Sequence, residues 1–390
     1  MLRLMIALSV AVPLCLASLW WLGRPASPDA FYDPPRGEKL APGRLLRVEE
    51  FSRDVPPHAR AWRILYATTR ADASPAVASA LVVTPQKAVA TANPIIAWAH
   101  GTTGVARGCA PSLMKHPFLN VPALGPLIEN GWALVATDYV GLGTDGGHAY
   151  LVGEDAARAV LDSVRAANQM KDATLETRYV VWGHSQGGNS ALWTGARAGD
   201  YAPELKALGV AALAPASDMA KLAQSTQATT FGKIVNSLLI SAYAGYYPDI
   251  DMPSYVDGRS AILVRDIASR CVGDFGTFPS LASALVAPAA GIFSRDPMGG
   301  ALGRRLGENT PTGAIPAPLL IAQGLADDLI GPSIQDSYVA ARCAAGQAVD
   351  YRRYAGRDHM SLIADDSAAA RDLLEWTRDR FAGLPAESRC

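Results

Sequence analysis

Charge is scarce in this chain. Only 18% of its 390 residues are charged, and the formal net charge is −1. No run of lysine or arginine marks a polybasic arm, so the sequence lacks the electrostatic footprint of a nucleic-acid-binding protein. Internal repeats and heptads are absent too, which leaves no basis for a repeat array or a coiled coil. Apolar residues are plentiful at 49%, enough for one large domain or one domain with an insertion.

Cysteine and histidine are also few. The chain has five cysteines and six histidines, and no C-x-x-C or histidine-rich spacing indicates a metal site, so we expect neither a metal nor another cofactor. Apart from Cys15, the cysteines are Cys109, Cys271, Cys343 and Cys390. In an exported chain these four predict two disulfides, but the sequence alone leaves three pairings open.

The first residues have the pattern of an export signal. Met1-Leu2-Arg3 precedes an apolar run from Leu4 to Leu22. A charged start and an apolar middle are typical of a secretory signal, and small residues allow cleavage after Ala17. The run is also nearly long enough to span a bilayer, so an uncleaved anchor is the alternative. Either way, we expect the rest of the chain to be extracytoplasmic: secreted, periplasmic or held at the membrane by this segment.

The pattern along the chain predicts five parts. Residues 1–23 are the signal peptide or N-terminal anchor, and residues 24–60 are a proline-rich extended lead-in. Strand-like and helix-like runs alternate in residues 61–216 and 311–390, which predicts a mostly parallel sheet with helices on both faces. Residues 217–310 have helical stretches but no convincing strand, and predict a helical cap or lid over the carboxyl edge of the sheet. The expected strands are 62–69 and 76–84 (a hairpin at a sheet edge), 94–99, 132–137, 179–182, 207–214, 318–323 and 349–354.

The stretch Arg178–Ala191, RYVVWGHSQGGNSA, carries the strongest chemical signal. A strand-length apolar run meets the pattern G-x-S-x-G and passes into a helix, as in the nucleophile turn of α/β-hydrolases. A serine on such a sharp turn exposes its hydroxyl, and side chains two residues on either side would collide, so glycine is favoured there. Ser185 is therefore the predicted nucleophile.

A serine nucleophile needs a base, and the base needs an acid; in this fold they follow the serine in the order acid, histidine. His359 is the only histidine after Ser185. Asp327 and Asp328 both follow the predicted strand 318–323, and the spacing G-x-x-D-x-x-hydrophobic favours Asp327. Asp358 precedes the base directly and is expected at the surface.

Two backbone N–H groups are expected to bind the oxyanion: that of Gln186, and one from the loop after the strand 94–99. Thr102 is the preferred second donor, with Thr103 as the alternative. In the predicted cap, Leu238, Leu239 and Tyr243 could line an acyl tunnel, but packing of the cap would explain them equally well. Other substrate-binding residues are unknown from the sequence.

Several stretches together resemble the secretory lipase family of α/β-hydrolases, which contains the fungal lipase A type and many bacterial homologues. They are HGTTG followed by CAPS, DYVGLGT with GHAYL, WGHSQGG, YAPEL, QGLADDLIGP and GRDHMS. The resemblance implies export, an α/β-hydrolase fold with a helical cap, and hydrolysis of carboxylic esters. It also implies Ser185, Asp327 and His359 as the triad.

The resemblance further implies the disulfide pairs Cys109–Cys271 and Cys343–Cys390. One departure concerns the acid loop: Gly331 precedes Pro332 where the family commonly has a hydrophobic residue, which leaves the choice between Asp327 and Asp328 open.

The expected activity is that of a serine lipase or carboxylesterase working through an acyl-enzyme. The alternatives are an acyltransferase using the same triad and a catalytically silent binding protein. The expected partner is a small-molecule or lipid ester, contact with a lipid interface is compatible with it, and the oligomeric state is left open.

Overall fold

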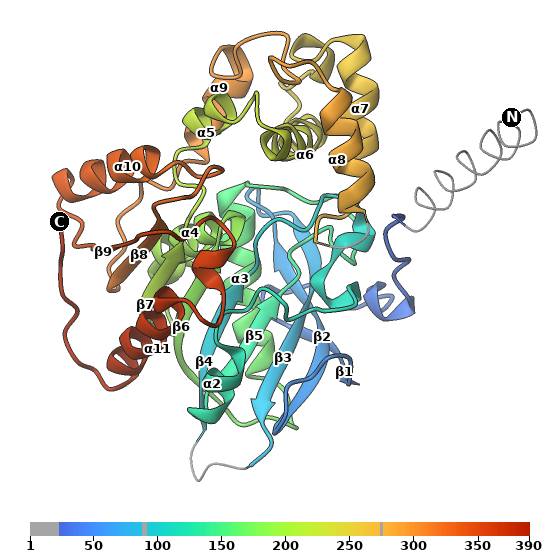
Figure 1. Cartoon of the computed structure of the whole chain (residues 1–390). Helices are drawn as coiled ribbons and strands as arrows, with labels where there is room; N and C mark the ends of the chain where they lie inside the picture. Colours follow the sequence, from blue (N-terminus) through green and yellow to red (C-terminus); the bar gives the residue numbers. More distant parts are fainter. Residues whose placement is uncertain (1–22, 88–91, 274–275) are drawn as a thin grey trace, which may run out of the picture.

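The computed structural model describes residues 23–87, 92–273 and 276–390, so the predicted signal or anchor lies almost wholly outside the described residues. In the described part the strands form one nine-stranded sheet in the order β1-β2-β3-β5-β4-β6-β7-β8-β9 (Figure 1). The strands are β1 (Leu45–Phe51), β2 (Ala59–Thr69), β3 (Pro75–Pro85), β4 (Asn93–Ala99), β5 (Ala133–Thr137), β6 (Leu175–His184), β7 (Lys206–Leu213), β8 (Leu319–Gly324) and β9 (Asp350–Tyr354).

Pairing in the sheet changes from antiparallel to parallel at β5. Strands β1, β2, β3 and β5 pair antiparallel in that order, whereas all pairs from β5 through β4 to β9 are parallel. The expected hairpin is β2–β3, but it does not form the edge of the sheet. That edge is β1, which lies in the predicted lead-in. Its residues are mostly half-buried or exposed, so it lacks the apolar run that reveals the inner strands.

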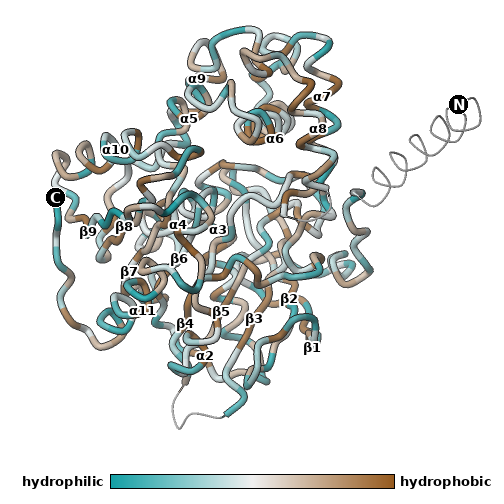
Figure 2. The backbone as a smooth tube through the Cα atoms, in the orientation of Figure 1, coloured by the Kyte–Doolittle hydropathy of each residue, from teal (hydrophilic) through white to brown (hydrophobic). Residues whose placement is uncertain are grey.

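Helices cover both faces of the sheet. Buried residues of α3 (Gly153–Ala167), α4 (Gln186–Tyr201) and α10 (Pro332–Ala344) pack on one face, and those of α2 (Leu124–Glu129) and α11 (Ala368–Phe381) pack on the other. Figure 2 shows the hydrophobic residues concentrated in the strands between these layers. The last helix, α11, begins at Ala368, because the hydroxyl of Ser367 caps it by accepting from Ala369 N.

Between β7 and β8 the described residues form a group of helices above the strand ends (Figure 1). They are α5 (Met219–Ser225), α6 (Thr230–Tyr246), α7 (Gly258–Ala268), α8 (Thr277–Val286) and α9 (Gly300–Glu308). Short 3-10 turns lie at η1 (Ala30–Tyr32), η2 (Arg107–Cys109), η3 (Pro111–Leu113), η4 (Met252–Ser254) and η5 (Ser361–Ile363). The helices α5 to α9, here called the cap, have their own hydrophobic core.

The structure contains both disulfides that the family resemblance implies. Cys109–Cys271 joins the loop after β4 to the end of α7, with a Cα–Cα distance of 5.2 Å. Cys343–Cys390 ties α10 to the C-terminus, with a Cα–Cα distance of 5.7 Å. Each closes a long loop, so each stabilises the fold by about 4–5 kcal/mol in the chain-entropy model. The first one also fixes the cap to the sheet.

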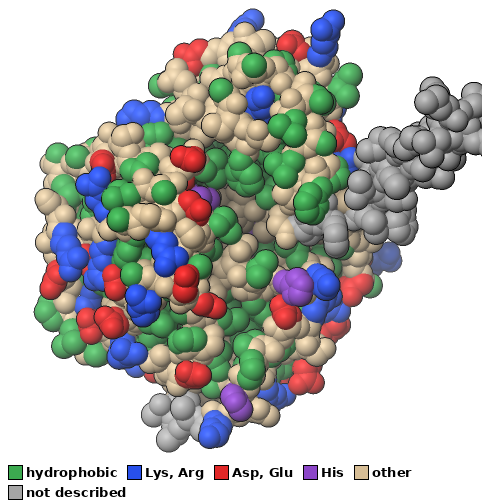
Figure 3. All heavy atoms as spheres, viewed as in Figure 1, with side chains coloured by type: hydrophobic (Ala, Val, Ile, Leu, Met, Phe, Trp, Pro, Cys, Tyr) green, Lys and Arg blue, Asp and Glu red, His purple; other side chains and the backbone are tan. Residues whose placement is uncertain are grey.

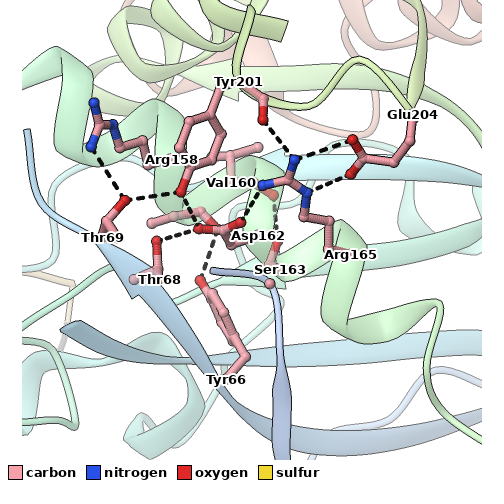
Figure 4. A network of polar contacts seen from close by, with 12 residues as sticks. Tyr66, Thr68, Thr69, Arg158, Val160, Asp162, Ser163, Arg165, Tyr201 and Glu204 are labelled. Atoms are coloured by element: carbon pink, nitrogen blue, oxygen red, sulfur yellow. Dashed lines mark hydrogen bonds and ion pairs between the residues drawn. The ribbon is translucent and has the colours of Figure 1, made fainter. Parts of the chain in front are cut away.

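A buried polar network fixes α4, the helix that follows Ser185, against α3 and β2 (Figure 4). Asp162 of α3 is fully buried and accepts hydrogen bonds from Thr68 Oγ1 at 2.6 Å, Tyr201 OH at 2.7 Å and Arg165 Nη1 at 2.9 Å. Arg165 also pairs with Glu204. Because each carboxylate oxygen is paired, the network can be buried without an orphaned charge.

Candidate active site

Ser185 lies in the sharp turn between β6 and α4. Its backbone has φ 58° and ψ −119°, a strained conformation for a residue other than glycine. Hydrogen bonds from Ser185 N to Leu213 O (3.0 Å) and from Ala216 N to Ser185 O (3.0 Å) hold the turn against β7 and its loop. The strain is therefore maintained by the neighbouring strand.

The two glycines of G-x-S-x-G are required by close backbone contact. A Cβ atom on Gly183 would collide with the carbonyl oxygen of Gly187, and one on Gly187 would collide with that of Ala99. Any larger side chain would therefore push α4 away from β4 and β6. The sequence prediction of this turn rests on the same geometry.

Asp327 and His359 form a close pair. Asp327 Oδ2 lies 2.8 Å from His359 Nδ1, and the aspartate is only 3% exposed. Its other oxygen, Oδ1, accepts from Leu329 N at 2.9 Å and from Ile330 N at 2.8 Å, which fixes the carboxylate plane. Asp328, by contrast, is exposed and makes no hydrogen bond to another residue in the described part of the chain. The structure thus brings Asp327, and not Asp328, to the histidine.

The backbone of His359 is anchored beside the serine turn. His184 Nε2 lies 2.9 Å from His359 O, and the two rings are 4.6 Å apart. Among the described residues no hydrogen bond joins Ser185 Oγ to His359 in this structure. Catalytic hydrogen bonds are often long without substrate and shorten in the reacting complex. His359 is therefore held against His184, the residue that precedes Ser185.

Asp358 shapes the loop that presents His359. Its carboxylate is exposed, as expected, and accepts from Met360 N at 3.1 Å and Ser361 N at 2.7 Å. The bond from Ser361 N–H is the main reason that the pKa of Asp358 is lowered. The ionised side chain thus closes the turn that follows it.

The two expected oxyanion donors lie in the same cavity as Ser185. Gln186 is the first residue of α4, so its N–H has no acceptor within the helix, and the helix dipole adds positive charge there. In the described part of the chain the N–H of Thr102 also donates no hydrogen bond. Thr103, the alternative, does not line this cavity and instead accepts from Val272 N at 2.8 Å.

This cavity has a volume of only about 30 Å³, far below the ~300 Å³ at the lower end of small-molecule sites. The cap contributes about half of its lining residues: the apolar Met219, Leu222, Ala223, Val235 and Leu239, and the polar Thr226 and Asn236. Of the expected acyl-binding residues only Leu239 lines it; all three are buried in the cap core, but Leu238 and Tyr243 do not reach this cavity. The residues from α5 were missed, since their apolar spacing also suits simple packing.

A second hollow of about 290 Å³ opens beside His359. Phe231 of α6, Leu329, Asp328, Asp358 and the histidine itself are among its lining residues. Figure 3 shows a hollow on this face, with hydrophobic side chains gathered in it. Leu329 lines both spaces, so it lies between the serine cavity and the histidine hollow.

Three buried histidines surround the site without joining the pair. Burial lowers the pKa of His100 to about 4 and of His148 to about 3, and it lowers the pKa of His184 well below the ordinary value. The ring nitrogens of His100 lie near the carbonyl oxygens of Gly101 (2.6 Å) and Asp138 (3.4 Å). All three are therefore neutral in the folded protein at pH 7.

Because these histidines are neutral in the folded protein, we expect the free energy of unfolding to fall in mild acid. The unfolded chain takes up protons near its histidine pKa of about 6.5 while the folded chain does not, so lowering the pH favours unfolding. Lowering the pH from about 7.5 to about 5.5 should lower the free energy of unfolding by about 1.4 kcal/mol for each histidine, or by about 4 kcal/mol for the three together. Buried carboxylates such as Asp162, whose pKa burial raises, act in the opposite sense where the pH falls through that raised pKa.

Urea unfolding at the two pH values measures the effect. A His100→Gln variant should lose about 1.4 kcal/mol less than the wild type on acidification. A pH-independent free energy of unfolding, or an identical loss in the variant, would contradict the neutral buried histidines.

Neither a metal site nor a membrane helix is found in the ranges described above. No three His, Cys, Asp or Glu side chains there are grouped so as to hold a metal ion. Likewise, none of the helices described above has the length and hydrophobicity needed to cross a bilayer.

Comparison with known proteins places the chain in a family. The family model for secretory lipases matches residues 119–389, more than half of the chain. The chain belongs to the secretory lipase family. Its mixed nine-stranded sheet with flanking helices is the α/β-hydrolase fold in its lipase A-like form. It superposes on Candida antarctica lipase A in its closed state with a TM-score of 0.75 and 17% identity, covering 93% of this chain and 87% of that one.

Some related proteins are named as lipases or esterases, and one is named as a probable inactive lipase. The chain is 28% identical to the "probable inactive lipase MT1628" of Mycobacterium tuberculosis (strain CDC 1551 / Oshkosh), covering 94% of this chain and 87% of that protein. It is 24% identical to Lipase 5 of Candida albicans (strain SC5314 / ATCC MYA-2876), covering 96% and 84%. The rice cell wall degrading esterase LipA from Xanthomonas oryzae shares the fold with a TM-score of 0.65 and 18% identity, covering 88% and 97%.

Proposed function

We propose that this secretory lipase family member is an active serine hydrolase of carboxylic esters. The observation that carries the proposal is the 2.8 Å contact between Asp327 and His359, held beside a serine on a strained turn. Two free N–H groups lie in the cavity with that serine. This combination matches the needs of acyl transfer: a nucleophile, an oriented base and oxyanion donors.

The proposed reaction follows from these contacts. Ser185 Oγ attacks the ester carbonyl and passes its proton to His359 Nε2, while Asp327 holds Nδ1–H and stabilises the imidazolium. The N–H groups of Gln186 and Thr102 bind the oxyanion, each contributing about 3 kcal/mol to transition-state stabilisation. His359 then protonates the leaving alcohol, and water hydrolyses the acyl-enzyme by the reverse sequence.

The two spaces on either side of Leu329 are assigned to the two parts of the ester substrate. We place the acyl chain on the apolar side lined by α5 and α6, because Ser185 and the oxyanion donors lie there. The alcohol belongs on the side of His359, since this residue gives it a proton. The present cavity of about 30 Å³ is too small for an acyl chain, so α5 and α6 must shift for substrate to enter.

The proposed site of action is outside the cytoplasm. Membership of a secretory family and two disulfides support an oxidising, extracellular location. We assign the apolar N-terminus to export, by a cleaved signal or a retained anchor. We also propose that the natural substrates are lipid esters.

One observation favours a second candidate, a silent binding protein: a relative over most of the chain is named a probable inactive lipase. Hydrolysis of p-nitrophenyl esters of increasing acyl length by the purified chain decides between them. We expect turnover with a clear preference for chain length, and no turnover of any ester would contradict the proposal. Adding an acceptor alcohol and analysing the products separates hydrolysis from acyl transfer.

A further inference from the structure

The segment Gly147–Leu151, between β5 and α3, contacts both proposed oxyanion donors. Tyr150 OH lies 2.7 Å from Thr102 Oγ1, and His148 Nε2 lies 3.1 Å from Gln186 Nε2. His148 is 7% exposed and Tyr150 is 1% exposed; the His148–Gln186 bond is buried, which strengthens it, and the Tyr150–Thr102 bond is partly buried. Two side chains of one short segment thus reach the two sides of the oxyanion site.

The bond at its other ring nitrogen fixes how His148 holds Gln186. His148 Nδ1 lies 3.1 Å from Val140 O, and because a carbonyl oxygen only accepts, Nδ1 carries the hydrogen. His148 Nε2 is then an acceptor, and Gln186 Nε2 donates to it. The stacking of His148 on Tyr139, with ring centroids 5.7 Å apart, keeps the ring in place. The side chain of Gln186 is therefore held in one orientation at the start of α4.

The contact between Tyr150 and Thr102 has a preferred direction. A phenol is a stronger hydrogen-bond donor than an aliphatic hydroxyl, so Tyr150 OH donates and Thr102 Oγ1 accepts. The hydroxyl hydrogen of Thr102 is then free, and this residue lines the cavity that contains Ser185. Thr102 can thus present two donors to an oxyanion, its N–H and its O–H.

The same segment is joined to the cap. Tyr243 OH of α6 donates to Leu151 O at 3.2 Å. Leu151 has φ 58°, which is unfavourable for leucine and persists only where the surroundings hold it. Leu151, in its strained conformation, and Tyr150 before it therefore connect α6 to Thr102.

We propose that His148 and Tyr150 are positioning residues of the oxyanion site, and that Tyr150 makes the Thr102 hydroxyl a third oxyanion donor. This inference rests on the proposed ester hydrolysis. A correctly placed donor matters in the transition state more than in substrate binding, so loss of positioning lowers kcat and leaves KM nearly unchanged.

The test compares wild type, Y150F, T102V and the double variant in p-nitrophenyl ester turnover, with inhibition by a trifluoromethyl ketone that forms a hemiketal oxyanion on Ser185. Y150F should lower kcat about ten- to hundredfold with KM within about threefold, and should raise the inhibition constant by the same factor as kcat/KM falls. The double variant should be no slower than T102V, because Tyr150 acts through that hydroxyl. Y66F removes another buried tyrosine hydroxyl, bonded to Thr137 and Ala159, and should keep the wild-type kcat.

Wild-type kcat and inhibition in Y150F, or losses that multiply in the double variant, would overturn the inference. Should Y150F fail to fold, a T102V chain with the wild-type kcat would overturn it equally. A wild-type chain without ester turnover would instead contradict the proposed function, so the two failures are distinct.

Discussion

A Ser185→Ala chain should hydrolyse p-nitrophenyl esters about 10⁴- to 10⁶-fold more slowly than the wild type, with an unchanged melting temperature. Removal of the hydroxyl leaves His359 with no nucleophile to activate, and only the oxyanion donors and binding contribute to the residual rate. Alanine has no larger side chain than serine at this strained turn, so the fold should persist. Initial rates and a thermal melt of both chains measure the two quantities.

Ser163→Ala is the matched control. Ser163 is also buried, on α3, and its hydroxyl donates to Val160 O at 2.7 Å within that helix. This variant should retain the wild-type rate. If S185A retained more than a few per cent of the rate while S163A was normal, another residue would be the nucleophile.

Asp327→Asn should lower kcat about 10³- to 10⁴-fold, whereas Asp328→Asn should leave it unchanged. The N–H groups of Leu329 and Ile330 need an acceptor oxygen at Oδ1, so the amide NH₂ of an asparagine must face His359. An NH₂ group donates to Nδ1 and leaves the hydrogen on Nε2, which can then no longer take the proton of Ser185.

The pair of variants separates orientation from charge. Both remove one negative charge near His359, but only the first changes its tautomer. Steady-state kinetics with one p-nitrophenyl ester suffices. Equal losses in D327N and D328N would indicate a general electrostatic effect and contradict the assigned role of Asp327.

The sequence predicted the parts of this molecule whose physics is local. Buried parallel strands such as β4 and β6 appear as apolar runs, and the collision of backbones at Gly183 and Gly187 explains the pattern around Ser185. The prediction of His359 as the base used only the order of residues along the chain. These predictions require no knowledge of distant contacts.

The remaining features depend on tertiary contacts. The edge strand β1 pairs on one side only and carries little apolar signal. The choice of Asp327 over Asp328 depends on which carboxylate meets His359, and Gly331 obscured that choice. Leu239 lines the serine cavity whereas Leu238 and Tyr243 do not, because an apolar helix such as α6 has two sides that a sequence cannot tell apart.

Neither could the sequence give the roles proposed for His148 and Tyr150. They lie in a recognisable motif, but nothing in their spacing links them to Thr102 and Gln186, which lie 48 and 38 residues away along the chain. Such hydrogen bonds are settled only when strand ends and loops meet at one edge of the sheet.

Labelling by a fluorophosphonate tests the central claim most directly, since it reports an activated serine without assuming any substrate. Intact-mass and peptide analysis of the treated wild-type chain should show one adduct, on Ser185, formed much faster than in D327N. An unlabelled wild-type chain, or an adduct on a different residue, would contradict the account.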